Sequence, residues 1–240
     1  MLLYIIRHAD PIYSPDSLTE KGHLQAKALA KRLKNSGISR IYCSPMVRTK
    51  QTAQPLCDAL GIKPVILDFT AESLAQESFF VKFEEENRTG WVFHQQTTNY
   101  KNNDTISLPT EASFDIEAFK DFDTNKFKEG YKRIEEESDN FLKSLGYERD
   151  GSLYKIINPN EERVAVFCHQ GFGLTWLSHL LRIPPHIFWA SFNIAHSSVT
   201  ILSFPNYENK LTTPKCLQVA DLSHLYGEAL PYTYDNELML

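Results

Sequence analysis

The sequence predicts an α/β fold, a three-layer α/β/α sandwich with a mostly parallel central sheet and an inserted, largely helical cap. Short apolar runs rich in strand-forming residues alternate with amphipathic segments of helical period, as in strands joined by crossover helices. A more polar segment, residues 73–150, interrupts this alternation and is the predicted cap. The length of 240 residues allows a sizeable core, so we expect residues 1–240 to form a single domain around this insertion.

The first part of the chain is predicted to alternate strand and helix. Thr19 is a suitable N-cap and Gly37 a suitable stop for the first helix, whose apolar stripe includes Leu24. The second helix contains Pro55, which should kink the helix or remove a backbone hydrogen bond. The predicted elements are a strand at 2–6, a helix at 17–37, a strand at 38–45, a helix at 46–61 and a strand at 63–69.

The same alternation resumes after the insertion. Residues 162–185 are interpreted as a strand that runs directly into a helix, and Pro184 and Pro185 should end that helix. Residues 197–204 form one more predicted strand. Within the insertion, apolar residues at helical spacing predict an amphipathic helix over 131–146.

The composition excludes several classes of function. No apolar run approaches the roughly 18 residues of a membrane span, and the first ten residues lack the basic start and cleavage site of a signal peptide. A net charge of -5 argues against general binding of nucleic acid. The four cysteines show no CxxC spacing, which favours reduced thiols and a cytoplasmic location.

Charged residues gather at one edge of the predicted sheet. Arg7 and His8 follow the first strand, Arg48 follows the second, and His169 follows the apolar run that ends at residue 168. Ligands of open α/β sheets bind at the carboxyl ends of the strands. The sequence therefore predicts that two arginines and two histidines converge at a binding site there.

Four short stretches carry a resemblance to a known family. In order and spacing, RHADP, SLTEKG, SPMVRTKQTA and CHQG resemble the signatures of the histidine phosphatase (phosphoglycerate mutase-like) superfamily. The resemblance covers roughly residues 1–72 and 160–205, and the stretch ADLSHLYGEALP adds a likeness to a bacterial phosphatase branch. The chain departs from the family pattern at Ala9 and Gln170, where glycine is usual or frequent.

The resemblance implies hydrolysis of a small phosphorylated metabolite without a metal or other cofactor. His8 would be the nucleophile that forms a phosphohistidine, and a neutral ring is needed for that attack. Arg7 and Arg48 would bind the phosphoryl oxygens through their planar donor forks. His169, in its protonated form, would stabilise the charge that develops in the transition state.

The resemblance also implies a carboxylic acid that protonates the leaving oxygen. Glu72 stands shortly after the third predicted strand, in the register of the family's acid, and is the first choice for this proton donor. Glu77 is its rival and Asp10 a weaker third candidate. His224 is a candidate to close the pocket. The remaining histidines are expected to be structural or on the surface: His23, His94, His179, His186 and His196.

Three alternatives stay open beside hydrolysis. A phosphoglycerate mutase-like enzyme would return the phosphoryl group to the substrate, and a binding module would hold a phosphorylated ligand without turnover. A metal hydrolase using His8 and His169 would need an acidic cluster at ligand spacing, which the sequence does not show. We expect no membrane or nucleic-acid partner, and no motif in the insertion names the substrate or an oligomeric state.

Overall fold

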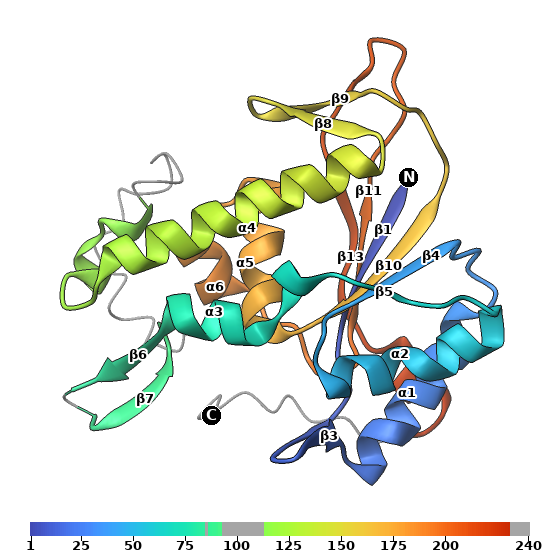
Figure 1. Cartoon of the computed structure of the whole chain (residues 1–240), viewed down its shortest axis with the longest axis horizontal. Coiled ribbons are helices and arrows are strands. Elements are labelled where there is room, and N and C mark those ends of the chain that lie inside the picture. Colours follow the sequence, from blue (N-terminus) through green and yellow to red (C-terminus); the bar gives the residue numbers. More distant parts are fainter. Residues whose placement is uncertain (85, 93–112, 231–240) are drawn as a thin grey trace.

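A six-stranded sheet lies at the centre of the computed structural model, which describes residues 1–84, 86–92 and 113–230 (Figure 1). Its strand order is β13-β11-β1-β10-β4-β5. Strands β1, β10, β4 and β5 run parallel, while β11 is antiparallel to both of its neighbours. The strands are β1 (Leu2–Arg7), β4 (Arg40–Cys43), β5 (Val65–Ile66), β10 (Arg163–Cys168), β11 (Val199–Ser203) and β13 (Lys215–Asp221). The predicted α/β class with a mostly parallel sheet is confirmed.

Helices cover both faces of this sheet, as the pattern of buried strand residues requires (Figure 1). Leu3 and Ile5 of β1 belong to one buried cluster, and Tyr4 and Ile6 belong to the other. Helices α1 and α2 pack on the second face, while α3, α4, α5 and α6 pack on the first. The helices are α1 (Glu20–Leu33), α2 (Val47–Leu60), α3 (Glu72–Phe79), α4 (Thr124–Ser144), α5 (Gln170–Leu181), α6 (Pro185–Ser191) and α7 (Ser223–Gly227).

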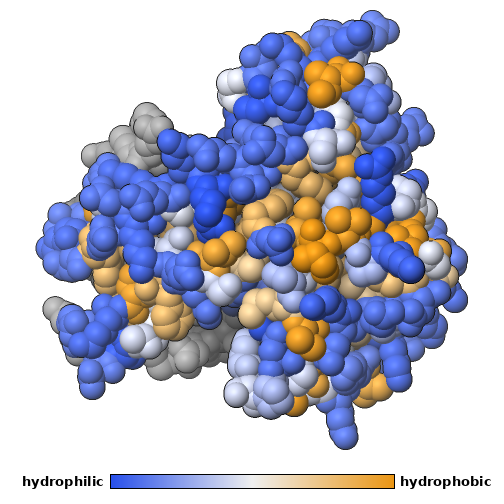
Figure 2. Space-filling model, in the orientation of Figure 1, coloured by the Kyte–Doolittle hydropathy of each residue, from blue (hydrophilic) through white to orange (hydrophobic). Residues whose placement is uncertain are grey.

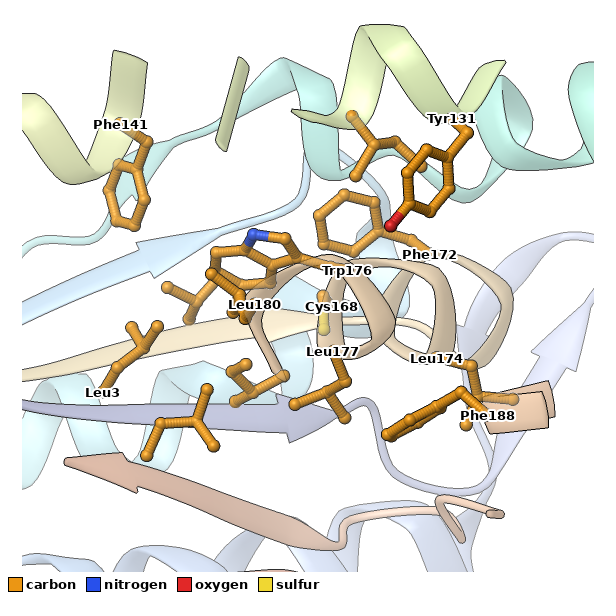
Figure 3. Packing of buried hydrophobic residues seen from close by; sticks show 14 of the residues in the cluster. Leu3, Tyr131, Phe141, Cys168, Phe172, Leu174, Trp176, Leu177, Leu180 and Phe188 are labelled. Atoms are coloured by element: carbon orange, nitrogen blue, oxygen red, sulfur yellow. The ribbon is translucent and has the colours of Figure 1, made fainter. Parts of the chain in front are cut away.

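The larger core is rich in aromatic side chains that surround α5 (Figure 3). Trp176 lies at its centre, in ring contact with Phe172 and Phe141. The indole Nε1 of Trp176 donates to Ser138 Oγ over 2.7 Å, so its one polar group is satisfied inside the core. This core holds α5 against both the sheet and α4.

The first helix differs from its prediction in its length and in its buried face. Thr19 is the N-cap as expected, because its Oγ1 accepts from the backbone amide of Gly22. The helix ends at Leu33, before Gly37, which lies in the left-handed turn that follows. Leu24 is 50% exposed, because the buried stripe runs along the opposite face of α1.

The third predicted strand is shorter than residues 63–69. Of this segment only Val65–Ile66, which form β5, pair with β4, and the chain then turns through a 3-10 segment, Asp68–Thr70, into α3. An edge strand has one unpaired side, which permits this early exit. Val65 and Ile66 are exposed, and Figure 2 shows apolar side chains gathered over this part of the surface.

The insertion contains helices and short hairpins. The helix expected at 131–146 is α4, which begins earlier and has 21 residues. No helix of the described ranges is long and apolar enough to cross a bilayer. His94 lies outside the described residues. The remaining strands are β2 (Pro11–Tyr13), β3 (Asp16–Leu18), β6 (Phe80–Phe83), β7 (Arg88–Trp91), β8 (Tyr147–Asp150), β9 (Leu153–Ile156) and β12 (Leu211–Thr212).

Candidate active site

The carboxyl ends of β1, β10 and β4 meet at one edge of the sheet, because β10 lies between the other two strands. Each strand ends in a residue of the predicted constellation or leads into one within a few positions. The five predicted site residues all have buried side chains at or near this edge: Arg7, His8, Arg48, Glu72 and His169.

The ring of His8 is fixed in one tautomer. Its Nδ1 lies 2.8 Å from the carbonyl oxygen of Ala9, and because a carbonyl only accepts, Nδ1 must carry the proton. The lone pair is therefore on Nε2. Burial lowers the pKa of His8 well below its usual value, and the neighbouring Arg7 and His169 lower it further. The structure thus holds His8 as a neutral imidazole, the form that a nucleophile requires.

The two arginines are each anchored at one end and unpaired at Nε. Arg7 Nη1 donates to the carbonyl oxygen of Ile194 over 2.7 Å, and Arg48 Nη1 donates to Asp16 Oδ1 over 2.8 Å. Both Nε atoms are buried and have no hydrogen-bond partner within the described residues. Burial lowers the pKa of Arg7 from its ordinary value. Two guanidinium groups with unused donors therefore lie near His169, and that of Arg7 also lies near His8.

His169 lies beside His8, with 5.1 Å between the ring centroids. Its Nε2 is 2.8 Å from Ser44 Oγ, whereas its buried Nδ1 has no partner in the described part of the chain. Burial lowers the pKa of His169 well below its usual value, and Arg48 and Arg7 add to the effect. In the protein alone, a dry environment and two nearby cations therefore favour the neutral form of His169.

Glu72, the first residue of α3, binds the first turn of α5. Its Oε1 accepts from the backbone amide of Gly171 and its Oε2 from that of Phe172, both over 2.9 Å. Burial raises the pKa of this carboxyl group, against the opposing effect of the two amides, Arg7 and Arg48. Its rival Glu77 is exposed and lies about one and a half turns farther along α3. Burial and contact therefore favour Glu72 over Glu77.

The departures from the family pattern occupy well-defined positions. The backbone amide of Ala9 donates to Thr52 Oγ1 over 2.9 Å, and its side chain is fully buried. Gln170 donates through Nε2 to Asn193 Oδ1 over 2.7 Å. A Cβ atom on the next residue, Gly171, would collide with the indole ring of Trp91. Hairpin β6–β7 thus packs directly against the start of α5.

His196 is a site neighbour that the sequence did not reveal. Its ring centroid lies 5.3 Å from that of His8, and its Nε2 accepts from Arg7 Nη2 over 2.7 Å. The sequence predicts a structural or surface role for His196 because this residue has no partner at ligand spacing. Strand β11 is antiparallel to β1, so its beginning lies at the edge where β1 ends. A sequence analysis that had recognised β11 as antiparallel to β1 would have placed His196 at the site.

The other candidates lie behind or away from this constellation. His224 Nε2 is 3.0 Å from Ser197 Oγ, and the Ser197 amide donates to the carbonyl oxygen of His8, so His224 supports the backbone behind the ring. Asp10 Oδ2 accepts from Thr19 Oγ1 over 2.6 Å. His23 is exposed, and His179 is buried elsewhere, against α4. Within the described ranges, no group of three or more potential ligands is arranged to hold a metal ion.

Comparison with known proteins places the N-terminal half in a family. The model of the histidine phosphatase superfamily (branch 1) matches residues 3–140. The probable phosphoglycerate mutase GpmB of Yersinia pestis (strain Pestoides F) is 36% identical over 72 residues, which are 26% of this chain and 34% of that protein. Its counterpart in Erwinia tasmaniensis is 33% identical over 75 residues, 28% of this chain and 34% of that protein. The matched region thus spans about a third of these relatives.

Solved structures share the fold over nearly the whole chain. A mutant phosphoserine phosphatase from Entamoeba histolytica in complex with phosphoserine has a TM-score of 0.58 at 15% identity, covering 93% of this chain and 98% of that one. The alpha-ribazole phosphatase from Shigella flexneri has a TM-score of 0.56 at 15% identity, covering 92% and 97%. Since the family model covers more than half of the sequence, this chain belongs to the histidine phosphatase superfamily (branch 1).

Proposed function

We propose that this chain is a phosphomonoester hydrolase that acts on a small phosphorylated metabolite through a phosphohistidine intermediate, without a metal ion. The observation that carries the proposal is the tautomer of His8. The carbonyl of Ala9 holds the ring proton on Nδ1 and leaves the lone pair on Nε2. Burial and Arg7 keep the pKa of the ring low, so this lone pair stays available for attack on phosphorus.

The unpaired donors around His8 support binding of a phosphate group. Arg7 Nε, Arg48 Nε and His169 Nδ1 are buried and have no partner among the residues that the structure describes. An unsatisfied buried polar atom costs about 1–3 kcal/mol, so their gathering in one place calls for an anionic partner. Phosphoryl oxygens would accept from both guanidinium groups in charge-assisted hydrogen bonds. Lysine could not supply the same fork of donors.

The charge of His169 would follow the arrival of the substrate. Burial, together with the two arginines, lowers its pKa in the protein alone. A phosphate dianion bound between them would add an opposite charge close to the ring, which favours the protonated form. His169 would then donate through Nδ1 to the phosphoryl group and stabilise its charge in the transition state. The predicted catalytic role of a protonated His169 is proposed for the substrate complex.

The reaction would proceed in two displacements on phosphorus. His8 Nε2 forms the nitrogen–phosphorus bond as the ester oxygen leaves, and the carboxyl group of Glu72 gives that oxygen its proton. Water then attacks the phosphohistidine, the nitrogen–phosphorus bond breaks, and the Glu72 carboxylate accepts a proton from the water. Inorganic phosphate leaves, and His8 is again neutral. The raised pKa of Glu72 supports its role as the acid of the first step.

The insertion is proposed to be part of the same single domain and to contribute to the choice of substrate. It reaches the site through Trp91, which packs on Gly171, and Glu72, the residue just before the insertion, binds the first turn of α5. Solved structures of this fold hold phosphoserine and 3-phosphoglyceric acid in the Entamoeba histolytica enzyme. Both compounds are therefore sensible first substrates for this chain.

A second candidate function is phosphoryl transfer of the phosphoglycerate mutase kind. It is favoured by the curated relatives, which are named probable phosphoglycerate mutases and match about a third of their own length. Both functions share the phosphohistidine, and they differ in the fate of the phosphoryl group. Hydrolysis releases it as inorganic phosphate, whereas a mutase returns it to a hydroxyl group of the substrate.

Rapid-quench kinetics with a phosphorus-labelled ester test the proposal. We expect a labelled protein that is stable in base and labile in acid, and no such label in His8→Ala. Circular dichroism should show that His8→Ala remains folded. Label that persists in the folded variant would contradict the assignment of His8. The product decides between the two functions, since label in inorganic phosphate supports hydrolysis and label in an isomeric ester supports the mutase.

A further inference from the structure

His196 joins one of the two arginines of the site to a carboxylate outside it. Arg7 Nη2 donates to His196 Nε2 over 2.7 Å. On the other side of the ring, His196 Nδ1 lies 3.8 Å from Asp10 Oδ1. Asp10 is itself held by the hydroxyl group of Thr19 over 2.6 Å and faces the ammonium group of Lys21 at 3.8 Å. A chain of contacts thus leads from the first turn of α1 to Arg7.

The contacts determine which ring nitrogen of His196 carries the proton. A guanidinium group only donates, so His196 Nε2 must hold a lone pair and the proton must be on Nδ1, toward Asp10. Burial lowers the pKa of His196 to about 2, with further lowering by Arg7 and Lys21. The ring is therefore neutral over the range in which an enzyme of this family would be assayed. It accepts from Arg7 throughout that range.

His196 completes the fixation of the Arg7 side chain. The carbonyl oxygen of Ile194 binds Nη1 over 2.7 Å and His196 binds Nη2, so both terminal nitrogens of the guanidinium group are tied down. Its plane is then fixed, and its unpaired Nε keeps a constant position. The ring of His196 also lies against that of His8, at 5.3 Å between centroids. Loss of the acceptor would free the plane of Arg7 to rotate.

We propose that His196 is a positioning residue that orients the guanidinium group of Arg7 for the phosphoryl oxygens. This inference rests on the proposed function, because Arg7 needs a fixed plane only if it binds the reacting group. His196 touches no reacting atom in this account. Its effect is transmitted through one hydrogen bond to a residue that does. The Asp10 carboxylate faces the protonated Nδ1 at 3.8 Å, which is beyond hydrogen-bond distance, and so favours that tautomer only through its charge.

Three variants of the full chain separate this role from simple packing. His196→Phe keeps a ring and removes the acceptor, whereas His196→Gln keeps a side-chain oxygen that can accept from Arg7. His23→Phe is the matched control, because His23 is an exposed histidine of α1 outside the site. Circular dichroism and unfolding temperatures establish that the proteins compared are folded.

We expect His196→Phe to lower kcat/KM about 10- to 100-fold, the usual range for a lost charge-assisted hydrogen bond. It should also weaken competitive inhibition by inorganic phosphate, while His196→Gln recovers part of both and His23→Phe changes neither. In an Arg7→Lys background, His196→Phe should lower kcat/KM by less than about threefold more, because the guanidinium group that His196 orients is already gone. The pH–rate profile should keep both limbs, since His196 does not titrate there.

Several results would overturn the inference. One is full additivity of the His196→Phe and Arg7→Lys effects, which would mean that the two residues act independently. Loss of a limb of the pH–rate profile in His196→Gln would make His196 an acid or base instead. Wild-type kinetics and phosphate inhibition in a folded His196→Phe protein would remove the role altogether. Failure of the proposed function has a different signature, namely unchanged turnover in His8→Ala, while phosphate inhibition still reports on Arg7.

Discussion

Asp16 forms an ion pair with Arg48, in which Oδ1 accepts from Nη1 over 2.8 Å. The other carboxylate oxygen accepts from the backbone amide of Val47 over 2.7 Å, so Asp16 binds the first turn of α2 at two points. It fixes the orientation of Arg48, and at the same time it places a negative charge near the proposed phosphate site. The two effects have opposite consequences for anion binding and can be separated by mutation.

Asp16→Asn should retain an acceptor for Arg48 and remove the charge. We expect inorganic phosphate to inhibit this variant at a concentration about 2- to 5-fold lower, because a partly exposed like charge costs up to about 1 kcal/mol. Asp16→Ala should instead reduce turnover, since Arg48 loses its support. Competitive inhibition at constant ionic strength measures both. Glu162→Gln, which breaks the ion pair with Arg40, is the control away from the site. Weaker inhibition of Asp16→Asn would refute the electrostatic part of this account.

Arg48→Lys preserves the positive charge and loses the donor fork. We expect turnover to fall at least about 100-fold, because a lysine cannot make paired charge-assisted bonds to two phosphoryl oxygens. The unfolding temperature should change little, since the buried methylene groups remain. Arg40→Lys, an exposed arginine on β4, serves as the comparison. Turnover close to wild type in a folded Arg48→Lys protein would argue against the proposed clamp.

The proton donor can be identified from the leaving group. Glu72→Gln should slow hydrolysis of an alkyl phosphate about 10²- to 10⁴-fold and affect an aryl phosphate much less, because a phenolate leaves without a proton. The variant should also lose the limb of the pH–rate profile that belongs to the acid. Glu77→Gln, on the exposed side of α3, should match the wild type for both substrates. The reverse pattern would transfer the role to Glu77.

Stability should decrease as the pH falls below the ordinary pKa of histidine, about 6.5. In the folded state burial lowers the pKa of four site-side histidines: His8, His169, His196 and His224. The unfolded chain then binds protons that the folded chain does not. Each of these histidines therefore lowers the free energy of unfolding by about 1.4 kcal/mol per pH unit between pH 6.5 and its pKa in the folded state. That value is about 4 for His224.

Unfolding temperatures at pH 7.5, 6.5 and 5.5, in buffers without phosphate, measure this dependence. We expect a steep fall in the unfolding temperature from pH 6.5 to 5.5. Between pH 7.5 and 6.5 the fall is partly opposed by His179, whose pKa is raised by Asp139 and Glu135 in spite of its burial. In the His224→Asn variant the unfolding temperature should fall less steeply over the same pH range. Inorganic phosphate should raise the unfolding temperature, because a ligand that binds only the folded state stabilises it. Unfolding temperatures that are equal at the three pH values would contradict the assignment of neutral buried rings.

Gly171→Ala should disturb the site through a steric effect alone. The added methyl group would collide with the ring of Trp91, so either hairpin β6–β7 or the first turn of α5 must move. The backbone amide of Gly171 binds Glu72, and we expect hydrolysis of alkyl phosphates to suffer more than that of aryl phosphates. Trp91→Ala in the same protein should restore part of the loss. Activity that is unchanged in Gly171→Ala would show that the contact is easily relieved.

The strands that could be predicted from the sequence are those with both faces buried. The apolar runs of β1 and β10 were recognised because each face of these strands lies against helices. The prediction failed where tertiary contacts decide the outcome, as at the edge strand β5, where only two residues pair. The sequence predicts Leu24 on the buried stripe of α1, but Leu29 and Leu33 bury the opposite face and leave Leu24 exposed.

The candidate site could be predicted where a charged residue follows a parallel strand. Arg7 ends β1, and His8 and His169 directly follow β1 and β10. Arg48 lies in the first turn of α2, the helix that follows β4. His196 does not follow a parallel strand, since it precedes an antiparallel strand and reaches the site from the opposite direction. The roles of these residues remain predictions, while their convergence is a property of the structure.

The position of β10 between β1 and β4 has a consequence for folding during synthesis. Leu2 pairs with Arg163, so the first strand must wait for most of the chain before it finds its parallel partner. At about 5–20 residues per second, a ribosome needs seconds to tens of seconds to supply that partner. Pairing over such long sequence separations is slow because loop closure comes before the gain in contacts. A nascent chain therefore carries His8, the proposed nucleophile, long before it carries its neighbour His169, and the candidate site can assemble only after residue 169 has been translated.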